Sequence, residues 1–320
     1  MPLLQTHYDP PLIFRNGHLS TIYSGAVRRV KELVQQRERL ELTDGDFLDL
    51  DWSFAKGPAT RAAILLHGLE GNAQRPYITG SAKLLTENGI DVCAINYRGC
   101  SGEPNRSFRS YHSGATEDLE AVVRHILDLD RYKSLYIKGF SLGGNITLKY
   151  LGGADPVPKQ IKAGIAISVP CHLYSSLTEL LKPKNILYAD RFKKKLIEKL
   201  KIKQALYPQR INRSDIGRIR TLKDFDDIYT SRAHGFTDAM DYYEKCSSLP
   251  FLKNIGIPTL IINARNDSFL GNQCYPIKEA ERNKALFLEL PNYGGHVGFY
   301  DRDNVTYTEK RAINFIEGHQ

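Results

Sequence analysis

The sequence predicts an α/β fold in which helices flank a mainly parallel sheet and a helical insertion interrupts the chain. Short apolar runs rich in β-forming residues alternate with segments of helical spacing over most of the 320 residues, which is typical of β-α-β units. This alternation breaks between residues 171 and 250. With 42% apolar and 25% charged side chains, the composition is that of an ordinary globular chain. Together these observations favour one large domain with an insertion.

The first sixty residues predict a helical arm and then an antiparallel strand pair within 38–54, whose turn is marked by Thr-Asp-Gly-Asp at 43–46. Further strands are expected where β-rich runs are bounded by turn residues, at 62–67, 90–97, 134–138, 161–169, 257–263 and 284–290. Helical spacing predicts helices at 76–88, 115–130, 144–152 and near 307–317.

The interval from 171 to 250 has no convincing buried strand and is rich in Lys, Tyr and Leu at helical spacing. A connection of about eighty residues between two sheet strands is usually a functional lid rather than a loop. We therefore divide the chain into a core domain, 1–170 and 251–320, and a helical cap, 171–250.

The net charge of +8 is concentrated in one segment of the chain. Residues 191–220 hold eleven Lys and Arg against two acids, a net of +9, so the remainder sums to about −1. Apolar residues interleaved with these cations favour a solvated helix face that covers a core. The alternative is a peripheral contact with an anionic membrane surface, or attraction of acidic substrates. A nucleic-acid partner is not expected, because the sequence has none of the usual nucleic-acid-binding motifs.

The sequence predicts a cytoplasmic protein without a cofactor. No apolar run approaches the roughly eighteen residues of a membrane span, and the N-terminus lacks the layout of a secretory signal. Cysteines occur at positions 93, 100, 171, 246 and 274, an odd number without zinc-ligand spacing. Reduced thiols and no metal site are therefore expected.

Gly139-Phe140-Ser141-Leu142-Gly143 is a G-x-S-x-G that follows a predicted strand and opens a helical pattern. This context is what a nucleophile elbow requires, since a sharp strained turn there lifts the serine hydroxyl above the sheet. The two flanking glycines leave room for the turn, and Gly144 lets the next helix pack closely. Ser141 is thus the candidate nucleophile.

A serine hydroxyl needs a base to take its proton and a carboxylate to hold that base in the right tautomer. After a nucleophile elbow these partners are expected in the order acid, then His, each just past a later strand. Asp267 follows the predicted strand at 257–263, and His296 follows the one at 284–290 on a glycine-rich loop. We predict Asp267 as the acid and His296 as the base.

The oxyanion that develops during acyl transfer needs backbone N–H donors. One is expected from Leu142, the residue after the nucleophile, and the other from the loop that follows the strand at 62–67. That loop reads His-Gly-Leu-Glu-Gly at 67–71, whose glycines allow the backbone to turn an amide inward. Leu69 is the candidate donor there.

Other motifs have structural interpretations that we favour over catalytic ones. Cys100 and Glu103 lie beside the predicted catalytic edge, but Ser141 already fills the nucleophile role. Asp226 and Asp227 have no third ligand at metal-binding spacing, so helix capping and lid packing explain them better than a metal does. Asp301 completes an H-x-x-x-x-D with His296, a spacing that some acyltransferases use, although His296 is already assigned as the base.

Six segments together resemble one family: 14–23 (FRNGHLSTIY), 67–72 (HGLEGN), 96–106 (NYRGCSGEPNR), 139–145 (GFSLGGN), 225–236 (FDDIYTSRAHGF) and 294–299 (GGHVGF). The chain resembles the α/β-hydrolase superfamily, and within it the YheT-like esterase branch, which is similar to the animal α/β-hydrolase-domain lipases. The resemblance spans nearly the whole chain. It implies an α/β-hydrolase fold and a carboxylic ester hydrolase with a cap over a Ser141, Asp267 and His296 site.

The expected activity is that of a carboxylesterase or lipase-like enzyme acting on a small-molecule or lipid ester. Two alternatives stay open: acyl transfer to an alcohol or amine by the same residues, and a catalytically silent protein that holds an apolar ligand. Epoxide hydrolases and haloalkane dehalogenases resemble this fold but use a carboxylate nucleophile where this chain has Ser141, so these activities are disfavoured.

Overall fold

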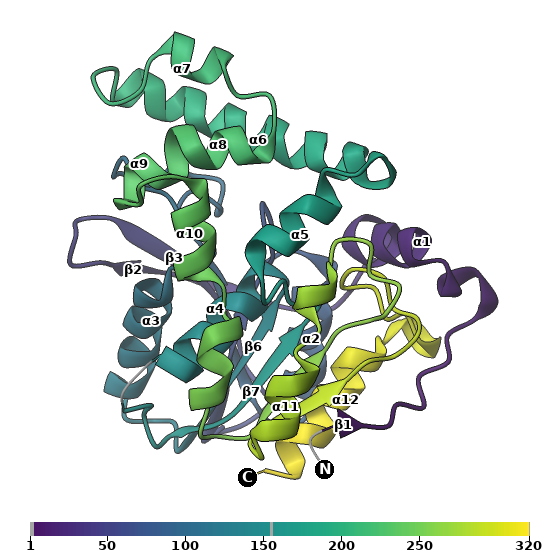
Figure 1. Cartoon of the computed structure of the whole chain (residues 1–320). Helices are drawn as coiled ribbons and strands as arrows, with labels where there is room; N and C mark the ends of the chain where they lie inside the picture. Colours follow the sequence, from purple (N-terminus) through teal and green to yellow (C-terminus); the bar gives the residue numbers. More distant parts are fainter. Residues whose placement is uncertain (1–2, 154–155, 320) are drawn as a thin grey trace.

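The computed structural model describes residues 3–153 and 156–319, and Figure 1 shows their arrangement. The described residues form a nine-stranded sheet in the order β1-β9-β8-β7-β6-β4-β5-β3-β2. Its strands are β1 (Leu3–Leu4), β2 (Gln36–Glu41), β3 (Phe47–Ser53), β4 (Arg61–Leu66), β5 (Asp91–Asn96), β6 (Ser134–Phe140), β7 (Ile161–Ile167), β8 (Thr259–Ile262) and β9 (Leu286–Glu289). Neighbours from β1 across to β5 pair in parallel, while β3 pairs antiparallel with β5 and β2. The mainly parallel sheet and its antiparallel edge pair are confirmed.

The described α-helices are α1 (Gly17–Ile22), α2 (Pro76–Glu87), α3 (Thr116–Asp128), α4 (Leu142–Gly153), α5 (Leu173–Leu180), α6 (Ile186–Leu206), α7 (Arg213–Gly217), α8 (Leu222–Phe225), α9 (Ser231–His234), α10 (Ala239–Cys246), α11 (Ile277–Arg282) and α12 (Tyr307–Glu317). Of these, α2, α3, α4, α11 and α12 cover the two faces of the sheet. One buried cluster joins the sheet to α3, α4 and α11, and a second joins it to α2 and α12. The four helices that spacing predicts are therefore present and pack as two outer layers.

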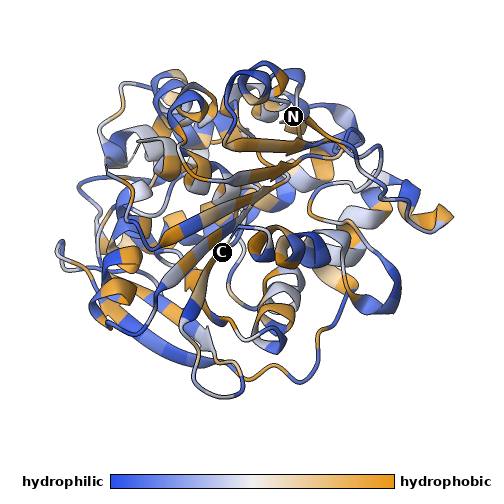
Figure 2. Cartoon of the chain, turned by 90° about the horizontal axis from the view of Figure 1, so that it is seen from below, coloured by the Kyte–Doolittle hydropathy of each residue, from blue (hydrophilic) through white to orange (hydrophobic). Residues whose placement is uncertain are grey.

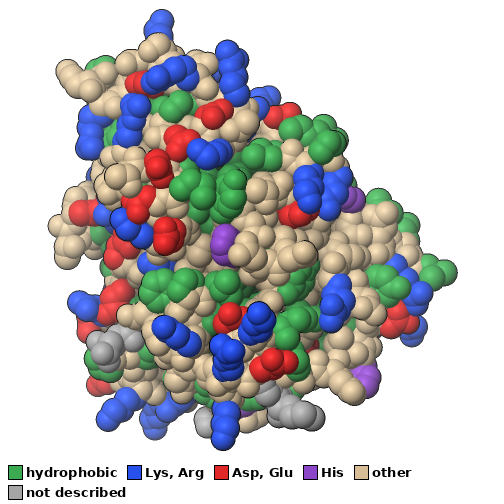
Figure 3. All heavy atoms as spheres, in the orientation of Figure 1, with side chains coloured by type: hydrophobic (Ala, Val, Ile, Leu, Met, Phe, Trp, Pro, Cys, Tyr) green, Lys and Arg blue, Asp and Glu red, His purple; other side chains and the backbone are tan. Residues whose placement is uncertain are grey.

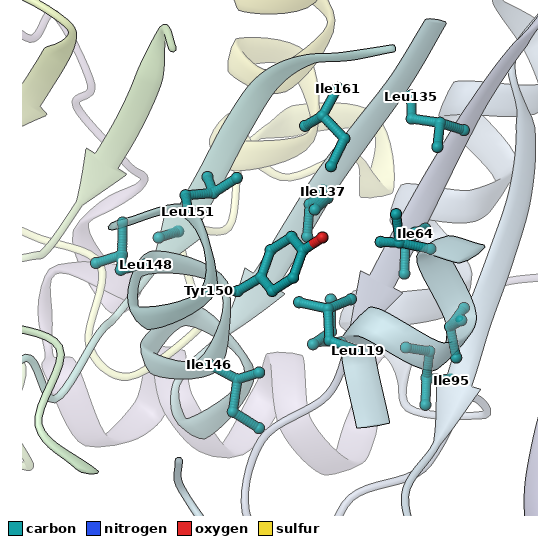
Figure 4. Packing of buried hydrophobic residues seen from close by; sticks show 14 of the residues in the cluster. Ile64, Ile95, Leu119, Leu135, Ile137, Ile146, Leu148, Tyr150, Leu151 and Ile161 are labelled. Atoms are coloured by element: carbon teal, nitrogen blue, oxygen red, sulfur yellow. The ribbon is translucent and has the colours of Figure 1, made fainter. Parts of the chain in front are cut away.

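Alternation along the strands explains why the sheet has two apolar faces. In β4, Ile64 and Leu66 belong to the cluster under α3 and α4, whereas Ala63 and Leu65 belong to the cluster under α2 and α12. Figure 4 shows the first cluster, in which residues of α3 and α4 pack against Ile64 and neighbouring strand residues. Figure 2 shows hydrophobic residues concentrated along the strands between the helical layers. Strands buried on both faces read as continuous apolar runs, which is the pattern in the sequence.

Between β7 and β8 the chain forms a helical layer, α5 to α10, that lies beyond one end of the sheet at the top of Figure 1. Apolar residues of α5, α6, α8 and α10 form one cluster of this layer. Other apolar residues of α6 and α8 form a second cluster with the α7–α8 connection and the π-helical turn after α8. Phe108, from the loop after β5, joins the second cluster. The layer is thus anchored to the rest of the chain by apolar contacts as well as by its two connections.

No helix in the described ranges combines the length and hydropathy needed to cross a membrane. All five cysteines are free and buried.

Lys138 is an ionisable group in the middle of β6 and is only 2% exposed. Its Nζ donates to Ser81 Oγ at 3.0 Å and to the Thr308 carbonyl at 3.1 Å. Burial is the main cause that lowers its pKa from 10.5 to about 8. Between these two values the unfolded chain binds more protons than the folded chain, so Lys138 makes stability rise with pH over this window.

We expect Lys138→Met to remove that dependence. The free energy of unfolding of the wild type, relative to the variant, should increase by up to about 3 kcal/mol as pH rises from 8 to 10.5. Urea unfolding of both proteins across this range measures the difference. A difference that stays constant with pH would show that Lys138 keeps an ordinary pKa in the fold.

Candidate active site

Ser141 lies on the sharp turn between β6, which ends at Phe140, and α4, which begins at Leu142. Its φ of +53° is in the left-handed region, which costs a non-glycine residue roughly 1–3 kcal/mol. The flanking glycines are required by close backbone approach. A Cβ on Gly139 would lie 2.1 Å from the Gly143 carbonyl oxygen, and one on Gly143 would lie 2.5 Å from that of Leu66. The predicted elbow geometry is present.

Gly144 allows close packing of α4, as the sequence predicts. A Cβ at this position would lie 2.6 Å from Val169 Cγ2, just past β7. The absence of a side chain therefore lets α4 pack against the sheet.

The structure brings the predicted acid and base to the same edge as Ser141. His296 Nε2 lies 2.8 Å from Ser141 Oγ, and His296 Nδ1 lies 2.8 Å from Asp267 Oδ2. The Asp267 side chain is fully buried, and its other oxygen accepts the Phe269 N–H at 2.9 Å. The ring of Phe269 packs against the imidazole with centroids 4.4 Å apart. These contacts hold the imidazole between a carboxylate and a hydroxyl.

The loop that carries His296 is held by the N-terminal arm, a role that the sequence analysis did not identify. The His296 N–H donates to Thr21 Oγ1 at 2.8 Å, and Thr21 Oγ1 donates to the Gly17 carbonyl at 2.6 Å. Ser20 Oγ donates to the Gly294 carbonyl and Ser24 Oγ to that of Gly298. The three contacts between the arm and the histidine loop join residues 274 or 275 positions apart, so no local pattern reveals them. The one available signal is the segment 14–23, which resembles the family without showing why.

Asn266 links the same loop to the acid. Its Oδ1 accepts the Gly295 N–H at 2.9 Å and its Nδ2 donates to the Arg15 carbonyl at 2.9 Å. Gly295 has a φ of +58°, and a Cβ there would lie 2.2 Å from the Gly17 carbonyl oxygen. The residue preceding Asp267 therefore ties the arm, the histidine loop and the acid loop together.

The two residues predicted to supply oxyanion amides, Leu69 and Leu142, line the same cavity as Ser141. Leu142 is the first residue of α4, so its N–H has no acceptor within the helix. In the loop after β4, the N–H groups of Gly68 and Glu70 donate to Tyr77 and Tyr111 hydroxyls, whereas no acceptor is found for Leu69 N–H within the described residues. A Cβ on Gly68 would lie 3.2 Å from Ser141 Cβ, so this loop passes close to the serine.

His67 stiffens this loop. It is fully buried, its Nδ1 lies 2.7 Å from the Gly68 carbonyl oxygen, and burial lowers its pKa to about 3. The ring is therefore neutral at pH 7, and it serves the loop as a hydrogen-bonding group rather than as a second base.

Ser141 and His296 open into a cavity of about 260 Å³ between the sheet edge and the helical layer. Its apolar lining comes mostly from the layer and includes Leu173, Leu177, Leu180, Tyr188, Phe192, Leu196, Leu222, Phe225, Tyr242, Tyr243 and Phe269. Polar groups on the wall include Asp226, which accepts hydrogen bonds from Tyr243 and Thr230 and whose pKa is raised to about 6 mainly by burial. Such a mostly apolar pocket with a few polar groups is typical of small-molecule sites.

The remaining motifs take structural roles. Asp227 pairs with Lys223 and accepts the Ala239 N–H at the start of α10. Glu103 pairs with Arg39 on the surface. Asp301 pairs with Lys310 and accepts the Arg302 N–H, and it makes no hydrogen bond or ion pair with His296.

Cys100 is buried, and Lys199 Nζ lies 3.2 Å from its Sγ. Burial raises the pKa of this thiol to about 11, so it is protonated at pH 7 and a poor nucleophile.

The arrangement can move a proton from Ser141 Oγ to His296 Nε2 while Asp267 accepts the hydrogen on Nδ1. A carbonyl group bound in this cavity beside Ser141 would share it with Leu69 and Leu142, the predicted oxyanion donors. These are the parts that acyl transfer through a serine needs. Among the described residues no group of three or more His, Cys, Asp or Glu side chains could hold a metal ion.

Comparisons with known proteins agree with this geometry. The pattern of the α/β-hydrolase fold family matches residues 63–303. The chain is 36% identical over 290 residues to the Escherichia coli (strain K12) protein named "Putative esterase YheT", covering 89% of this chain and 85% of that protein. It is 28% identical over 327 residues to human "Phospholipase ABHD3", covering 99% of this chain and 80% of that one.

Among solved structures, the Pyrococcus furiosus esterase Pf2001 superposes with a TM-score of 0.58 and 17% identity, covering 91% of this chain and 98% of that chain. At this identity the likeness shows a shared fold.

Proposed function

Because the chain belongs to the α/β-hydrolase fold family as a YheT-like member, we propose that it hydrolyses carboxylic esters through an acyl-enzyme on Ser141. Ser141 Oγ attacks the acyl carbonyl, and His296 takes its proton and then returns it to the leaving alcohol. Asp267 orients His296 and stabilises the imidazolium. The Leu69 and Leu142 amides bind the oxyanion. Water, activated by the same histidine, then releases the acid.

The observation that carries the proposal is the pair of 2.8 Å contacts linking Ser141 to His296 and His296 to Asp267, at the wall of an apolar cavity. A structural serine would need neither a strained turn nor a histidine at its hydroxyl. The names of the relatives, an esterase and a phospholipase, support an ester as the substrate class.

We further propose that residues 171–250 act as a cap. Residues of α5, α6, α8 and α10 supply most of the apolar lining, so an acyl chain held there would be shielded from water. The cap is also the basic part of the chain, and Figure 3 shows Lys and Arg side chains on the upper region that it occupies. Peripheral contact with an anionic membrane through this surface is a proposal that sedimentation with vesicles of varied anionic lipid content and salt can test. The five free cysteines suit a reducing compartment such as the cytoplasm.

Hydrolysis of p-nitrophenyl esters from acetate to palmitate tests the activity. The acyl chain length that is hydrolysed best indicates how long a chain the cavity holds. Acyl transfer is the second candidate, because the same residues would pass the acyl group to an alcohol or amine. Product analysis with competing acceptors separates the two reactions. A folded protein that binds these esters without turnover would favour the silent-binder alternative and contradict the proposal.

Thr21 offers a separate test of how the base is positioned. Thr21→Val keeps the side-chain shape but removes the acceptor for the His296 N–H and the donor to Gly17. We expect kcat/KM for the best ester to fall about 10-fold, because a hydrogen bond of roughly 1–1.5 kcal/mol that holds the base is lost. Thr21→Ser, which keeps the hydroxyl, is the matched control. Equal losses in both variants would indicate that the methyl group, and not the hydrogen bond, matters.

A further inference from the structure

A second cavity of about 320 Å³ adjoins the one that contains Ser141. The two share part of their lining, including Glu70, Arg75, Lys195 and Leu196. The first cavity is mainly apolar. The lining of the second also has many apolar groups, but it includes charged side chains from the loops after β4 and β5 and from α6: Glu70, Arg75, Arg98, Glu103, Lys195, Lys199 and Lys203. A substrate could therefore place its apolar part in the first cavity and a polar part at the boundary with the second.

Most cations of the second cavity are already neutralised or hydrogen-bonded. Lys199 pairs with Glu70 at 2.9 Å, and Arg98 pairs with three aspartates. Lys203 Nζ donates to the carbonyls of Asn105 and Ser107. The two carboxylates of this cavity have partners as well, because Glu103 pairs with Arg39 and Glu70 accepts a hydrogen bond from Tyr111.

Three cations at the Ser141 cavity have no ion-pair partner among the described residues. Arg75 and Lys195 lie at the shared wall, and Arg191 lies one turn before Lys195 on α6. No ion pair within the described residues includes any of the three. Arg75 is held in place by a 3.0 Å hydrogen bond from Nη2 to the Glu70 carbonyl, which leaves its other donors available.

Burial lowers the pKa of Lys195, and the charges of Arg75, Arg191 and Lys199 lower it further, while Glu70 opposes them. Glu70 is already paired with Lys199, so the positive charges of Arg75, Lys195 and Arg191 remain in excess at this wall and repel one another. A bound dianion would relieve this repulsion. An arginine fork with two further cations suits a phosphate group, because guanidinium and ammonium donors match its oxygens.

We propose that Arg75, Lys195 and Arg191 form a subsite for a phosphate group carried by the ester, so that the substrate class is acyl esters of phosphorylated alcohols. The inference rests on the proposed ester hydrolysis and adds the recognition of the alcohol side. The acyl chain lies in the apolar cavity, the ester carbonyl lies at Ser141, and the phosphate lies at the wall that Arg75 and Lys195 share.

The test compares 1-octanoylglycerol 3-phosphate with 1-octanoylglycerol, both below the concentration at which they form micelles, by measuring octanoate release. We expect wild-type kcat/KM to be at least about 10-fold higher for the phosphate ester, and this ratio to fall about 10-fold in Lys195→Gln and in Arg191→Gln. Lys195→Glu should reverse the preference. Lys194→Gln is the matched control, because Lys194 is exposed on the same helix and lines neither cavity.

Isothermal titration calorimetry on the Ser141→Ala variant measures affinity without turnover. This variant should bind the phosphate ester more tightly than the neutral ester, and adding Lys195→Gln to it should remove the difference in affinity. A titration of Ser141→Ala with inorganic phosphate alone tests whether the site binds a free anion. If inorganic phosphate binds Ser141→Ala as tightly as the phosphate ester does, the site takes a free anion and the proposal is overturned.

Equal kcat/KM for the two esters, or a preference that survives Lys195→Gln and Arg191→Gln, would also overturn it. Hydrolysis of the neutral ester by the wild type reports on the proposed function alone. Its absence, with selective binding of the phosphate ester intact, would overturn ester hydrolysis and leave the anion subsite supported.

Discussion

Replacing Ser141 with alanine is expected to lower kcat for the best p-nitrophenyl ester by about 10⁴-fold or more. The variant keeps the cavity and the oxyanion amides but has no hydroxyl for His296 to deprotonate, so the acyl-enzyme cannot form. Steady-state kinetics measure the loss. A fluorophosphonate probe, which reacts with activated serines, should label the wild type at residue 141 and leave the variant unlabelled. Ester turnover above a tenth of the wild-type rate would place the nucleophile elsewhere.

The strain at this position supplies a control for folding. Ser141→Ala keeps a non-glycine residue at a φ of +53°, so its stability should be close to that of the wild type. Ser141→Gly removes the steric cost of that conformation and is expected to gain up to about 1 kcal/mol in the free energy of unfolding while being equally inactive. Inactivity together with unchanged or higher stability would separate chemistry from folding.

The sheet and the site edge were predictable because both depend on local patterns. Strands buried on both faces give apolar runs such as 62–67, and the parallel arrangement places the ends of β6, β8 and β9 at one edge. Because Ser141, Asp267 and His296 follow the ends of these strands, the strand arrangement alone predicts that they lie close together. The G-x-S-x-G pattern places glycines at 139 and 143, where the backbone approaches too closely for a side chain, so the elbow could be predicted from the sequence.

Long-range contacts account for what could not be predicted. β1 has only two residues and is defined by its pairing with β9, 285 positions away, so no periodicity marks it. The hydrogen bond from His296 N–H to Thr21 also joins distant positions in the chain, so no local pattern predicts it. α4 begins at Leu142, two residues before the expected start, because the elbow passes directly into the helix.

The cations at the shared cavity wall are a further example. Arg75 precedes α2, whereas Lys195 and Arg191 belong to α6, and only the packing of the helical layer over the sheet edge brings them together. The sequence shows a basic segment at 191–220 but not which of its charges lack partners. That distinction separates a solvated helix face from a binding surface.

Asp267→Asn is expected to lower kcat by about 10⁴-fold with little change in fold, because it reverses the tautomer of His296. The Phe269 N–H donates to one oxygen of Asp267, so the asparagine carbonyl is retained at that position. Its amide NH₂ then faces His296 Nδ1, which must accept a hydrogen bond rather than donate one. Nε2 would consequently carry the proton and could not take another from Ser141.

Nitrogen-15 NMR of labelled histidine distinguishes this account from a general loss of structure. In the wild type the resonances of His296 should report a proton on Nδ1, and in Asp267→Asn a proton on Nε2, with thermal unfolding of the two proteins alike. Asp267→Ala is the contrasting variant, since it leaves the Phe269 N–H without its acceptor and the imidazole without its orienting group, so it should lose stability as well as activity. A kcat for Asp267→Asn within 10-fold of the wild type would mean that Asp267 shapes the loop without setting the tautomer of the base.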